Sequence, residues 1–375
     1  MTAQSDARYM ALALALGRRG QGRVWPNPQV GCVIVKDDRI VGRGHTADGG
    51  RPHAETVALA QAGTTAAGST AYVTLEPCAH HGQTPPCAEA LIAAGVKRVV
   101  IATADPDPRV AGKGEAMLRA AGVAVERGVH DRVARRDLAG FLLRVTRDRP
   151  FVTLKLACSL DGRIATAAGE SQWITGPQAR RAVHMMRARH DAVMVGAGTV
   201  RADDPSLTVR DLGITRQPAR VVISREGRLP ENAKMLRDGA TPPVYLCHQA
   251  GADVSAWTAR GAVSLPCDVA AGQVDPASAL AALAAQGITR VFCEGGGMLG
   301  AALLAAELVD ELVVFNAGMI IGAEGIPGLG AMGVDQLARS PRFRLDRVQQ
   351  MGPDIMHVWT RPDLDQVLDW RQSQA

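Results

Sequence analysis

Aromatic residues are scarce in this chain, at 3% of 375 residues, and the net charge is only +5. Both features argue against a nucleic-acid partner, because such partners usually require a dense basic face with stacking aromatic side chains. The charge excess lies in residues 1–148, which hold 19 Lys and Arg against 14 Asp and Glu, whereas the remainder holds 23 of each sign. A small phosphorylated molecule suits this balance better.

Long apolar runs are also missing, since no window approaches the roughly 18 residues of a membrane span. The apolar stretch at residues 10–16 is too short for a signal peptide, and Arg18 and Arg19 follow it on the wrong side. The seven cysteines are odd in number and widely spread, which argues against a disulfide framework. We therefore expect a cytoplasmic protein with no membrane partner.

Strand and helix patterns alternate twice along the chain, which predicts two α/β domains. In the first, helices are expected over residues 5–19 and from His53 and Pro86, with strands at 30–36, 39–44, 69–75 and 98–103. In the second, strands are expected at 151–156, 192–195, 220–223, 244–247, 290–293 and 311–315. The polar break at residues 148–150 predicts domains at 1–148 and 149–365.

The strongest chemical signal is His53-Ala54-Glu55, followed by Pro77-Cys78 and by Cys87. One imidazole and two thiolates can hold Zn²⁺ and leave its fourth position open, as catalytic zinc requires. A Glu55 carboxylate that does not bind the metal could move protons for zinc-bound water. This is the zinc-deaminase pattern, in which hydroxide attacks an amidine carbon of a nucleobase-like ring and ammonia leaves.

The local pattern also predicts where these groups lie. His53 and Glu55 are expected at a helix start, Cys78 at the opening of a helical turn, and Cys87 in the first turn of a helix, where thiolates are stabilised. The turn Pro26-Asn27-Pro28 could present an amide to a ring edge. Three further side chains could face the same pocket, namely Glu76, His80 and His81. Five cysteines are expected to be buried apolar residues: Cys32, Cys158, Cys247, Cys267 and Cys293.

The second domain contains Gly295-Gly296-Gly297-Met298-Leu299-Gly300, which satisfies G-x-G-x-x-G between an expected strand and helix. Backbone N–H groups there could hold a pyrophosphate. The motif lies near the end of its domain rather than in the first βαβ unit, and no acidic residue follows the next strand; both features disfavour a Rossmann fold. The lack of an acidic residue to bind a ribose 2′-hydroxyl also favours NADP over NAD. The alternative is a glycine turn for close packing. Gly196-Ala197-Gly198 is a poorer candidate.

Together these motifs resemble those of the bifunctional riboflavin-biosynthesis deaminase–reductases. In the first domain the resemblance rests on Pro26-Asn27-Pro28, Val30-Gly31-Cys32-Val33, His53-Ala54-Glu55, Thr74-Leu75-Glu76-Pro77-Cys78, His81-Gly82 and Thr84-Pro85-Pro86-Cys87. It continues through residues 159–163, 169–174 and 202–205 to Glu294-Gly295-Gly296. The spacing between the two cysteines belongs to that family rather than to transfer-RNA or cytidine deaminases.

The resemblance implies a cytidine-deaminase-like α/β/α domain followed by a dihydrofolate-reductase-like α/β domain. The first would deaminate a diaminopyrimidinone that carries a ribosylamino 5-phosphate, with zinc on His53, Cys78 and Cys87 and with Glu55 as proton shuttle. The second would use NADPH to reduce the ribosyl side chain to ribityl, with hydride delivered to C1 of the ring-opened sugar.

Matching positions imply two further sets of residues. The expected cofactor-binding residues are Ala157, Trp173, Thr199, Asp203, Gly296, Gly297, Met298, Leu299, Gly300, Ala301 and Ala302. The expected substrate-binding residues are Asn27, His80, Ser171, Arg187, Leu207, Arg210 and Glu294, with Lys155 and Asp161 as polar groups near the sugar. Trp173 could instead be core packing, and Arg187 a solvated helix residue.

Three positions depart from the family pattern, at Thr46, Gln83 and Arg225, where the family commonly has histidine, a basic residue and serine. Two other functions are compatible with the zinc motif: a nucleic-acid deaminase with an accessory domain, and a non-catalytic zinc scaffold. A homo-oligomer, plausibly a dimer, is expected because small α/β domains often pair.

Overall fold

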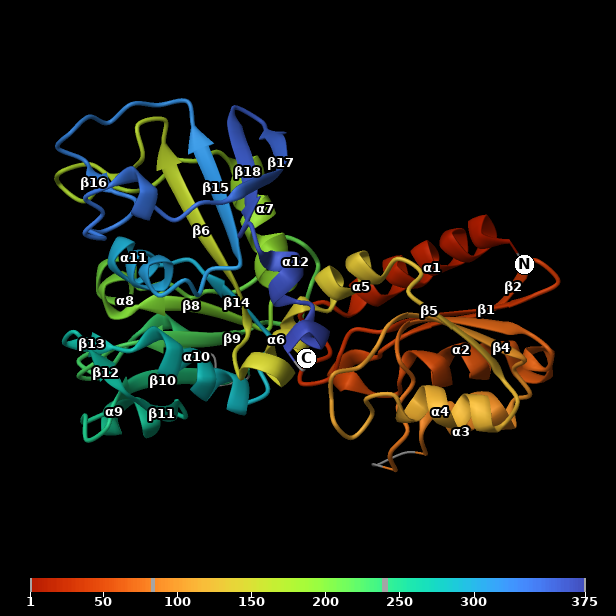
Figure 1. Ribbon diagram of the computed structural model, residues 1–375. Helices are drawn as coiled ribbons and strands as arrows, with labels where there is room; N and C mark the ends of the chain where they lie inside the picture. The colour runs from red at the N-terminus through yellow and green to blue at the C-terminus, as the bar shows by residue number, and fades with distance from the viewer. Residues whose placement is uncertain (1, 82–84, 238–241, 374–375) are drawn as a thin grey trace. The chain divides into compact units, whose positions relative to one another are not determined.

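The computed structural model describes residues 2–81, 85–237 and 242–373, which belong to two compact units (Figure 1). Unit 1 comprises Met1–Arg147 together with Asp365–Ala375, and unit 2 comprises Asp148–Leu364. The C-terminal segment, which includes most of α12 (Leu364–Val367), is tied to unit 1 by ion pairs. Arg136 donates to both carboxylate oxygens of Asp365, at 2.6 and 2.9 Å, and Arg371 pairs with Asp131 at 3.1 Å.

Unit 1 is a five-stranded sheet between two helical layers (Figure 1). The strand order is β2-β1-β3-β4-β5, with β3, β4 and β5 parallel and β1 antiparallel to both of its neighbours. The strands are β1 (Gly31–Lys36), β2 (Arg39–His45), β3 (Thr70–Leu75), β4 (Arg98–Thr103) and β5 (Ala124–Arg127). The helices are α1 (Ala3–Gly17), α2 (Ala54–Ala62), α3 (Cys87–Ala93), α4 (Lys113–Ala120), α5 (Asp131–Asp137) and α6 (Ala139–Arg147). This architecture confirms the predicted α/β/α domain.

Small residues explain how this unit builds a core with so few aromatics. Every residue of β3 is buried, as expected of a strand covered on both faces. A Cβ on Gly31 would lie 1.8 Å from the carbonyl oxygen of Ala13, and one on Gly44 would lie 2.2 Å from that of Ala54. The helices α1 and α2 can therefore approach the sheet only because these strand positions are glycine.

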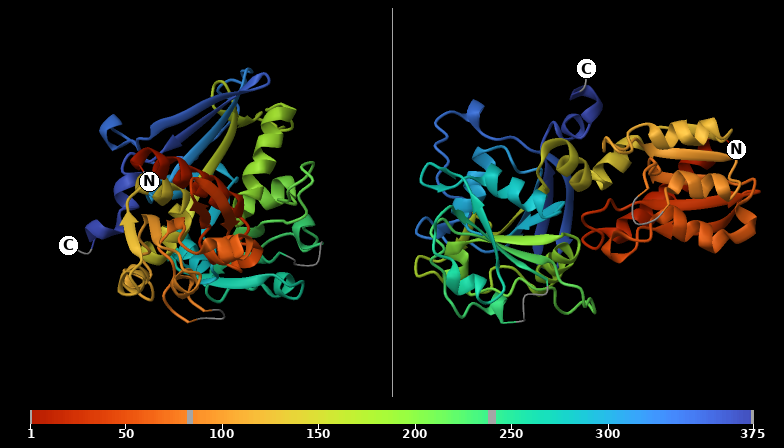
Figure 2. Two further views of the ribbon diagram at one scale, coloured as in Figure 1. Left: turned by 90° about the vertical axis from the view of Figure 1, so that its right-hand side faces the viewer. Right: turned by 90° about the horizontal axis from the view of Figure 1, so that it is seen from below.

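Unit 2 is built on a strongly twisted nine-stranded sheet (Figure 2). Its order is β11-β10-β9-β8-β14-β6-β15-β18-β17; the strands from β11 to β15 are parallel, and β18 and β17 are antiparallel. The strands are β6 (Phe151–Ser159), β8 (Ala192–Gly196), β9 (Ala219–Ile223), β10 (Val244–Gln249), β11 (Val263–Cys267), β14 (Arg290–Cys293), β15 (Glu311–Ala317), β17 (Arg344–Met351) and β18 (Asp354–Thr360). Two small sheets pair β12 (Val269–Ala270) with β13 (Gln273–Val274) and β16 (Ile326–Pro327) with β7 (Arg163–Ala165).

The helices of unit 2 are α7 (Pro177–Ala188), α8 (Ala197–Asp203), α9 (Ser255–Thr258), α10 (Pro276–Ala285) and α11 (Gly297–Ala305). Three of the few aromatics, Trp257, Phe292 and Phe315, are fully buried in its core. The predicted α/β class of this unit is confirmed. Among the described residues, no helix is sufficiently long and apolar to span a bilayer.

The predicted strands and helices are confirmed at these positions, with ends shifted by a few residues at most. One local prediction is wrong. Cys78 does not open a helical turn, because residues 76–81, 85 and 86, the described part of the chain between β3 and α3, form no helix. Prolines at 77, 85 and 86 restrict the backbone there and remove N–H donors that a helix would use.

Candidate functional site

A cluster of one histidine and two cysteines forms where three segments of unit 1 meet. His53 is the N-cap of α2, Cys87 is the first residue of α3, and Cys78 lies in the loop after β3. His53 Nδ1 lies 3.7 Å from Cys78 Sγ and 3.4 Å from Cys87 Sγ, and the three donor atoms lie within 4.8 Å of one another. We call these residues the His–Cys–Cys cluster.

The His–Cys–Cys cluster fits a tetrahedral zinc ion. Zn–N and Zn–S bonds of about 2.05 and 2.3 Å place tetrahedral N and S ligands about 3.6 Å apart, close to the observed separations. Hydrogen bonds from Cys87 and His53 lower the pKa of the Cys78 thiol to about 4, and the neighbouring Cys78 thiolate raises that of Cys87. Negative charge thus lies on the Cys78 sulfur, and a divalent cation would neutralise it and favour loss of the Cys87 proton as well.

Glu55 lies next to this cluster, in the first turn of α2, and is 4% exposed. Burial raises the pKa of its carboxyl group to about 7, the charge on Cys78 adds to the rise, and His53 opposes it. Among the described residues, the group of possible metal ligands does not include this carboxylate. Its position therefore suits a proton-transferring group that stays off the metal.

The residues predicted to contact substrate in unit 1 are held differently. Asn27 Nδ2 donates to the carbonyl oxygen of Gly50 at 2.9 Å, and a Cβ on Gly50 would collide with the Asn27 side chain at 2.1 Å. His80 Nδ1 is buried and has no hydrogen-bond partner among the described residues, so it can accept a ligand contact. His81 instead pairs with Glu89 at 3.0 Å.

Thr46, which departs from the family pattern, supports the turn that carries Asn27. Its hydroxyl donates to the Pro28 carbonyl oxygen at 2.9 Å and accepts from the Val30 N–H at 3.0 Å. The residue is 2% exposed, so its effect on a ligand acts through this turn. Gln83, the second departure, lies outside the described residues.

Glu76 does not face the cluster as predicted but caps α4. Its carboxylate accepts from the N–H groups of Gly112 and Glu115, at 3.1 and 3.2 Å. Asp105, which sequence reasoning missed, is 5% exposed, and burial raises the pKa of its carboxyl group to about 7. Its position in the sequence could have revealed it. Asp105 follows β4 and Cys78 follows β3, and because these strands are parallel neighbours, the residues after them lie at the same edge of the sheet.

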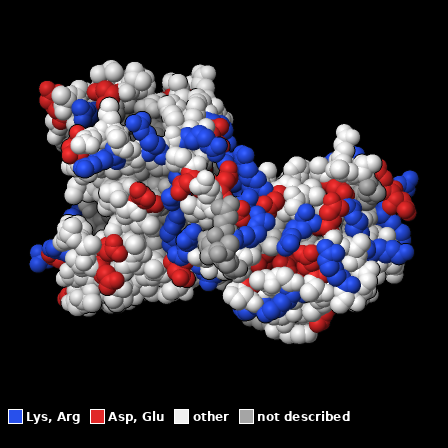
Figure 3. Space-filling model, in the orientation of Figure 1, with Lys and Arg blue, Asp and Glu red and all other residues white. Residues whose placement is uncertain are grey.

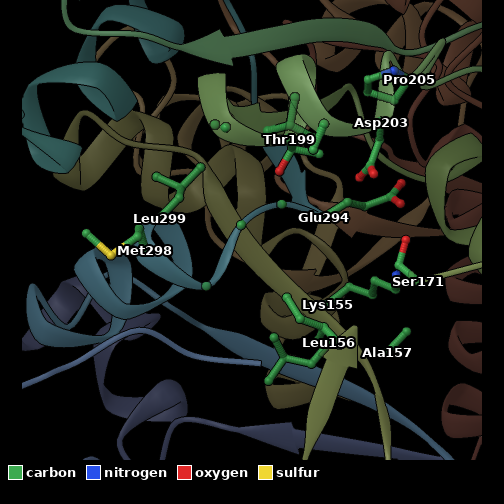
Figure 4. A pocket seen from close by; sticks show the side chains of 18 of the residues that line it. Lys155, Leu156, Ala157, Ser171, Thr199, Asp203, Pro205, Glu294, Met298 and Leu299 are labelled. Carbon is green, nitrogen blue, oxygen red and sulfur yellow. The ribbon is translucent and has the colours of Figure 1, made fainter. Parts of the chain in front are cut away.

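Unit 2 contains a pocket of about 1880 Å³ at the carboxyl ends of β6, β14, β8 and β9 (Figure 4). Pockets for a single ligand are typically about 300–1000 Å³, so this unit 2 pocket can hold two molecules. All but one of the residues predicted to bind cofactor or substrate in this unit line it: Ala157, Ser171, Trp173, Arg187, Thr199, Asp203, Leu207, Arg210, Glu294, Gly296, Gly297, Met298, Leu299, Ala301 and Ala302.

Gly300 is the exception, since it is absent from the described lining. A Cβ there would lie 3.1 Å from a Leu329 methyl group, so this glycine serves close packing. Asp161, predicted near the sugar, is likewise not among the lining residues. It accepts hydrogen bonds from the Ser159 hydroxyl at 2.6 Å and from Gly322 N–H at 2.7 Å, and so joins two loops.

The N-terminus of α11 is shaped to receive an anion. Gly296 is its N-cap, with φ of +82° and no side-chain cap, so the first N–H groups of the helix remain available. A Cβ on Gly297 would lie 3.1 Å from the backbone nitrogen of Gly330, where a second loop crosses. A larger residue would require this loop to shift, so glycine suits the close approach, and the available N–H groups suit a dinucleotide pyrophosphate.

Arg187 and Glu294 form a buried ion pair in the unit 2 pocket. Arg187 Nε and Nη2 donate to the two carboxylate oxygens of Glu294 at 2.5 and 2.9 Å, and Nη1 donates to the carbonyl oxygen of Thr208 at 2.8 Å. The side chains are 12% and 9% exposed. Three of the five guanidinium N–H groups of Arg187 are thus engaged, so this arginine is not a solvated helix residue, and one N–H on each of Nη1 and Nη2 remains for a ligand.

Lys155 lies beside this pair without a hydrogen bond or ion pair to any described residue. Burial lowers the pKa of its ammonium group, and the Glu294 carboxylate opposes the fall. Lys155, Ser171, Asp203 and Glu294 point to one region of the pocket (Figure 4). Burial raises the pKa of Asp203, and the charge on Lys155 opposes that rise.

Comparison with known proteins identifies both units. The RibD C-terminal domain family matches residues 150–357, and the cytidine and deoxycytidylate deaminase zinc-binding region matches residues 3–103. The riboflavin biosynthesis protein RibD of Escherichia coli is 43% identical over 93% of this chain and 98% of its own length, and that of Aquifex aeolicus is 39% identical over 96% and 100%.

Solved structures agree with this result. Acinetobacter baumannii RibD superposes with a TM-score of 0.87 at 42% identity, covering 96% of this chain and 99% of its own. A Thermotoga maritima diaminohydroxyphosphoribosylaminopyrimidine deaminase/5-amino-6-(5-phosphoribosylamino)uracil reductase superposes with a TM-score of 0.85 at 34% identity over the same shares. The chain therefore belongs to the RibD family of riboflavin biosynthesis proteins, which join a zinc-dependent pyrimidine deaminase to an NADPH-dependent reductase.

Proposed function

We propose that unit 1 deaminates 2,5-diamino-6-(5-phosphoribosylamino)pyrimidin-4(3H)-one and that unit 2 then reduces the ribosyl side chain of the product to ribityl. The observation that carries the first half is the His–Cys–Cys cluster, whose donor separations of 3.4 and 3.7 Å suit a tetrahedral ion, with Glu55 beside it. The family membership and the two-ligand size of the unit 2 pocket support the second half.

In the deamination, His53, Cys78 and Cys87 would hold the zinc, which when bound would lower the pKa of a water molecule to near 7. Glu55 would accept a proton from the attacking water and return it to the departing amino group, so that ammonia leaves. Asn27 and the unpartnered His80 Nδ1 bind the substrate, and the Gly50 carbonyl fixes the Asn27 amide group.

In the reduction, NADPH supplies a hydride to C1 of the sugar. Opening of the ribose ring puts a proton on the ring oxygen and leaves an imine, so the imine nitrogen requires another proton. Lys155 is the cation best placed to supply protons, because it lines the pocket, is half-buried, has no described partner and has a lowered pKa. Glu294 and Arg187 shape the wall beside it, and the first turn of α11 binds the pyrophosphate.

The other predicted residues that line the unit 2 pocket are proposed to contact either NADPH or the substrate. Ala157, Trp173, Thr199 and Asp203 face the cofactor together with the loop from Gly296. Ser171, Leu207 and Arg210 face the substrate.

The test of the deaminase half is a Glu55→Gln variant assayed for ammonia release from the phosphorylated pyrimidine, alongside its zinc content. We expect one bound zinc per chain and a fall in rate of at least 10²-fold, the usual range for a lost acid–base group. Glu126→Gln, which neutralises an exposed carboxylate on β5, is the matched control. Full deamination by the Glu55 variant would remove Glu55 from the mechanism, and an absence of bound zinc in the wild type would contradict the assignment of the His–Cys–Cys cluster as a metal site.

A nucleic-acid deaminase is the less favoured function. Basic and acidic side chains are interspersed over the face of each unit drawn in Figure 3, without the single-sign surface that a phosphate backbone requires. RNA binding that weakens with rising salt concentration would support the nucleic-acid deaminase instead.

We also propose a cytoplasmic homo-oligomer. All seven cysteines are free, which suits a reducing compartment. The edge strand β17 is exposed along nearly its whole length, with Leu345 and Val348 at 47% and 55%. Such an edge can pair with a second copy of the chain. Light scattering should report a dimer that Val348→Lys weakens; a monomeric native protein would refute this assignment.

A further inference from the structure

Two cysteines contact each other in unit 2, outside the His–Cys–Cys cluster. Cys247 lies on β10, and Cys267 is the last residue of β11, the strand at one edge of the nine-stranded sheet. Cys247 pairs with Leu265 in the register of these parallel strands, and Cys267 lies two positions beyond Leu265. Because side chains alternate along a strand, the two cysteines lie diagonally on the same face, where their side chains share a hydrogen bond. We call these residues the β10–β11 cysteine pair.

The two thiols of the pair differ in charge and in exposure. The hydrogen bond from the Cys247 thiol lowers the pKa of the Cys267 thiol, and the backbone N–H of His248 adds to the fall. Burial and the carboxylates of Asp268 and Asp275 oppose it. The same hydrogen bond and burial raise the pKa of Cys247. Cys247 is fully buried, whereas Cys267 is 7% exposed, so Cys267 is the thiolate that a small oxidant can reach.

A disulfide bond between these cysteines requires the end of β11 to move. A strand spacing of about 4.8 Å and a rise of about 3.3 Å per residue separate the Cα atoms of diagonal neighbours by about 8 Å, whereas a disulfide usually needs less than about 7 Å. The end of β11 can move, because Pro266 has no N–H for the sheet and β11 has no strand on its other side in the described sheet. His248 Nε2 and Ser264 Oγ, 2.7 Å apart, join β10 and β11 before this end. The displaced segment therefore begins after Ser264.

The chain that follows Cys267 borders the unit 2 pocket. It forms the short strands β12 and β13, and Gln273 and Val274 of β13 line the pocket. Between these strands, the carbonyl oxygen of Gly272 accepts a hydrogen bond from Arg225 Nη1 at 2.8 Å, and Arg225 also lines the pocket. A displacement at Cys267 is therefore transmitted to one wall of the unit 2 pocket.

We propose that the β10–β11 cysteine pair is a site of reversible oxidation by hydrogen peroxide, at which a disulfide bond closes and lowers the activity of unit 2. The loss of activity rests on the proposed reductase function, whereas the disulfide does not. The Cys267 thiolate attacks one peroxide oxygen, the O–O bond breaks, and the departing hydroxide takes up a proton to form water, which leaves a sulfenic acid.

The second step closes the bridge. Cys247 loses its proton, its sulfur attacks the Cys267 sulfur, the S–O bond breaks, and the departing hydroxide leaves with that proton as a second water. The two sulfurs thus supply the two electrons that reduce the peroxide. A dithiol reverses the bridge by thiol–disulfide exchange.

The test treats the zinc-loaded full chain with hydrogen peroxide, stops the reaction with catalase and alkylates the remaining thiols. Trypsin cleaves after Arg260, between the two cysteines, so mass spectrometry detects the bridge as a linked pair of peptides. We expect wild type to form this linked pair and to lose at least about 10-fold in NADPH-dependent reduction, because a misplacement of about 1 Å can cost up to about 10²-fold. Dithiothreitol should restore the activity. Cys247→Ala should instead accumulate a sulfenic acid on Cys267 that dimedone labels.

Cys158→Ala is the matched control, because it removes a comparably buried cysteine outside the pair and outside the described pocket lining. It should respond to peroxide as wild type does, whereas Cys267→Ala should keep its reductase activity. Zinc content and ammonia release are measured on the same samples, and only peroxide doses that leave both unchanged are compared. The response is thereby separated from oxidation of the His–Cys–Cys cluster.

Two outcomes would overturn the proposal: thiols of Cys247 and Cys267 that stay reduced at these doses, or a linked peptide pair without loss of reductase activity. A wild type that oxidises no NADPH before peroxide is added would sink the proposed function instead, and the linked peptides would still report on the disulfide. Should one alanine variant fail to fold, the other still removes the bridge.

Discussion

Neutralising Glu294 tests the ion pair in the wall of the unit 2 pocket. In Glu294→Gln the Arg187 guanidinium would remain buried without its counter-charge and next to the Lys155 ammonium group. Two unit charges about 4 Å apart interact by about 4 kcal/mol at an effective dielectric constant of 20. Removing one partner of a buried pair typically costs about 3–5 kcal/mol. We therefore expect unit 2 to lose about 3–5 kcal/mol of stability.

Urea unfolding followed by tryptophan fluorescence measures this loss, because Trp257 is 1% exposed within the unit 2 core. Glu231→Gln, an exposed carboxylate outside the pocket, should change stability by less than about 0.5 kcal/mol. Adding Arg187→Met to Glu294→Gln should cost less than the sum of the two single changes, since no uncompensated charge then remains from the pair. A Glu294 variant as stable as the control would refute this account of the pocket wall.

Three further outcomes follow from other parts of the structure. Cys87→Ser should abolish tight zinc binding measured by metal analysis, whereas Cys158→Ala, outside the cluster, should leave it unchanged. Burial lowers the pKa of His190 to about 3, so as the pH falls the unfolded chain takes up a proton on this imidazole before the folded protein does. The free energy of unfolding of wild type relative to His190→Gln should therefore fall by about 2 kcal/mol between pH 7 and pH 5, as measured by denaturant titration. Gly31→Ala should cost about 3 kcal/mol or more, since its Cβ would lie 1.8 Å from the carbonyl oxygen of Ala13 in α1, whereas Gly318→Ala meets nothing within 4 Å.

The zinc half of the protein could be predicted almost residue by residue. His53, Glu55, Cys78 and Cys87 lie in short motifs at the starts of helices and after a strand, so local sequence places their donor atoms. The prediction failed where a side chain had a second possible partner. Glu76 lies within the same motif, yet the N-terminus of α4 takes its carboxylate, and nothing in the local spacing reveals that competition.

The reductase half was predicted less completely, because sheet order brings its residues together. Arg187 and Glu294 are 107 positions apart and meet only because α7 packs near the end of β14. The strand pattern predicted six of the nine strands but not β11, β17, β18 or the order of the strands in the sheet. The G-x-G-x-x-G pattern also does not distinguish a glycine that faces a ligand from one that packs against a neighbouring side chain, as Gly300 does.

Charge counts alone cannot locate a phosphate site in unit 2, since residues 149–375 hold equal numbers of each sign. Which arginine binds the phosphate depends instead on whether its guanidinium is already paired with an acidic side chain. Arg187 is charge-paired with Glu294 and uses three of its five N–H donors on Glu294 and Thr208, whereas Arg210 lines the same pocket, is exposed, and forms no side-chain hydrogen bond or ion pair with any described residue. An anion gains most from a cation whose donors are free. The substrate phosphate should therefore bind at Arg210 rather than at Arg187, although the sequence treats the two arginines alike.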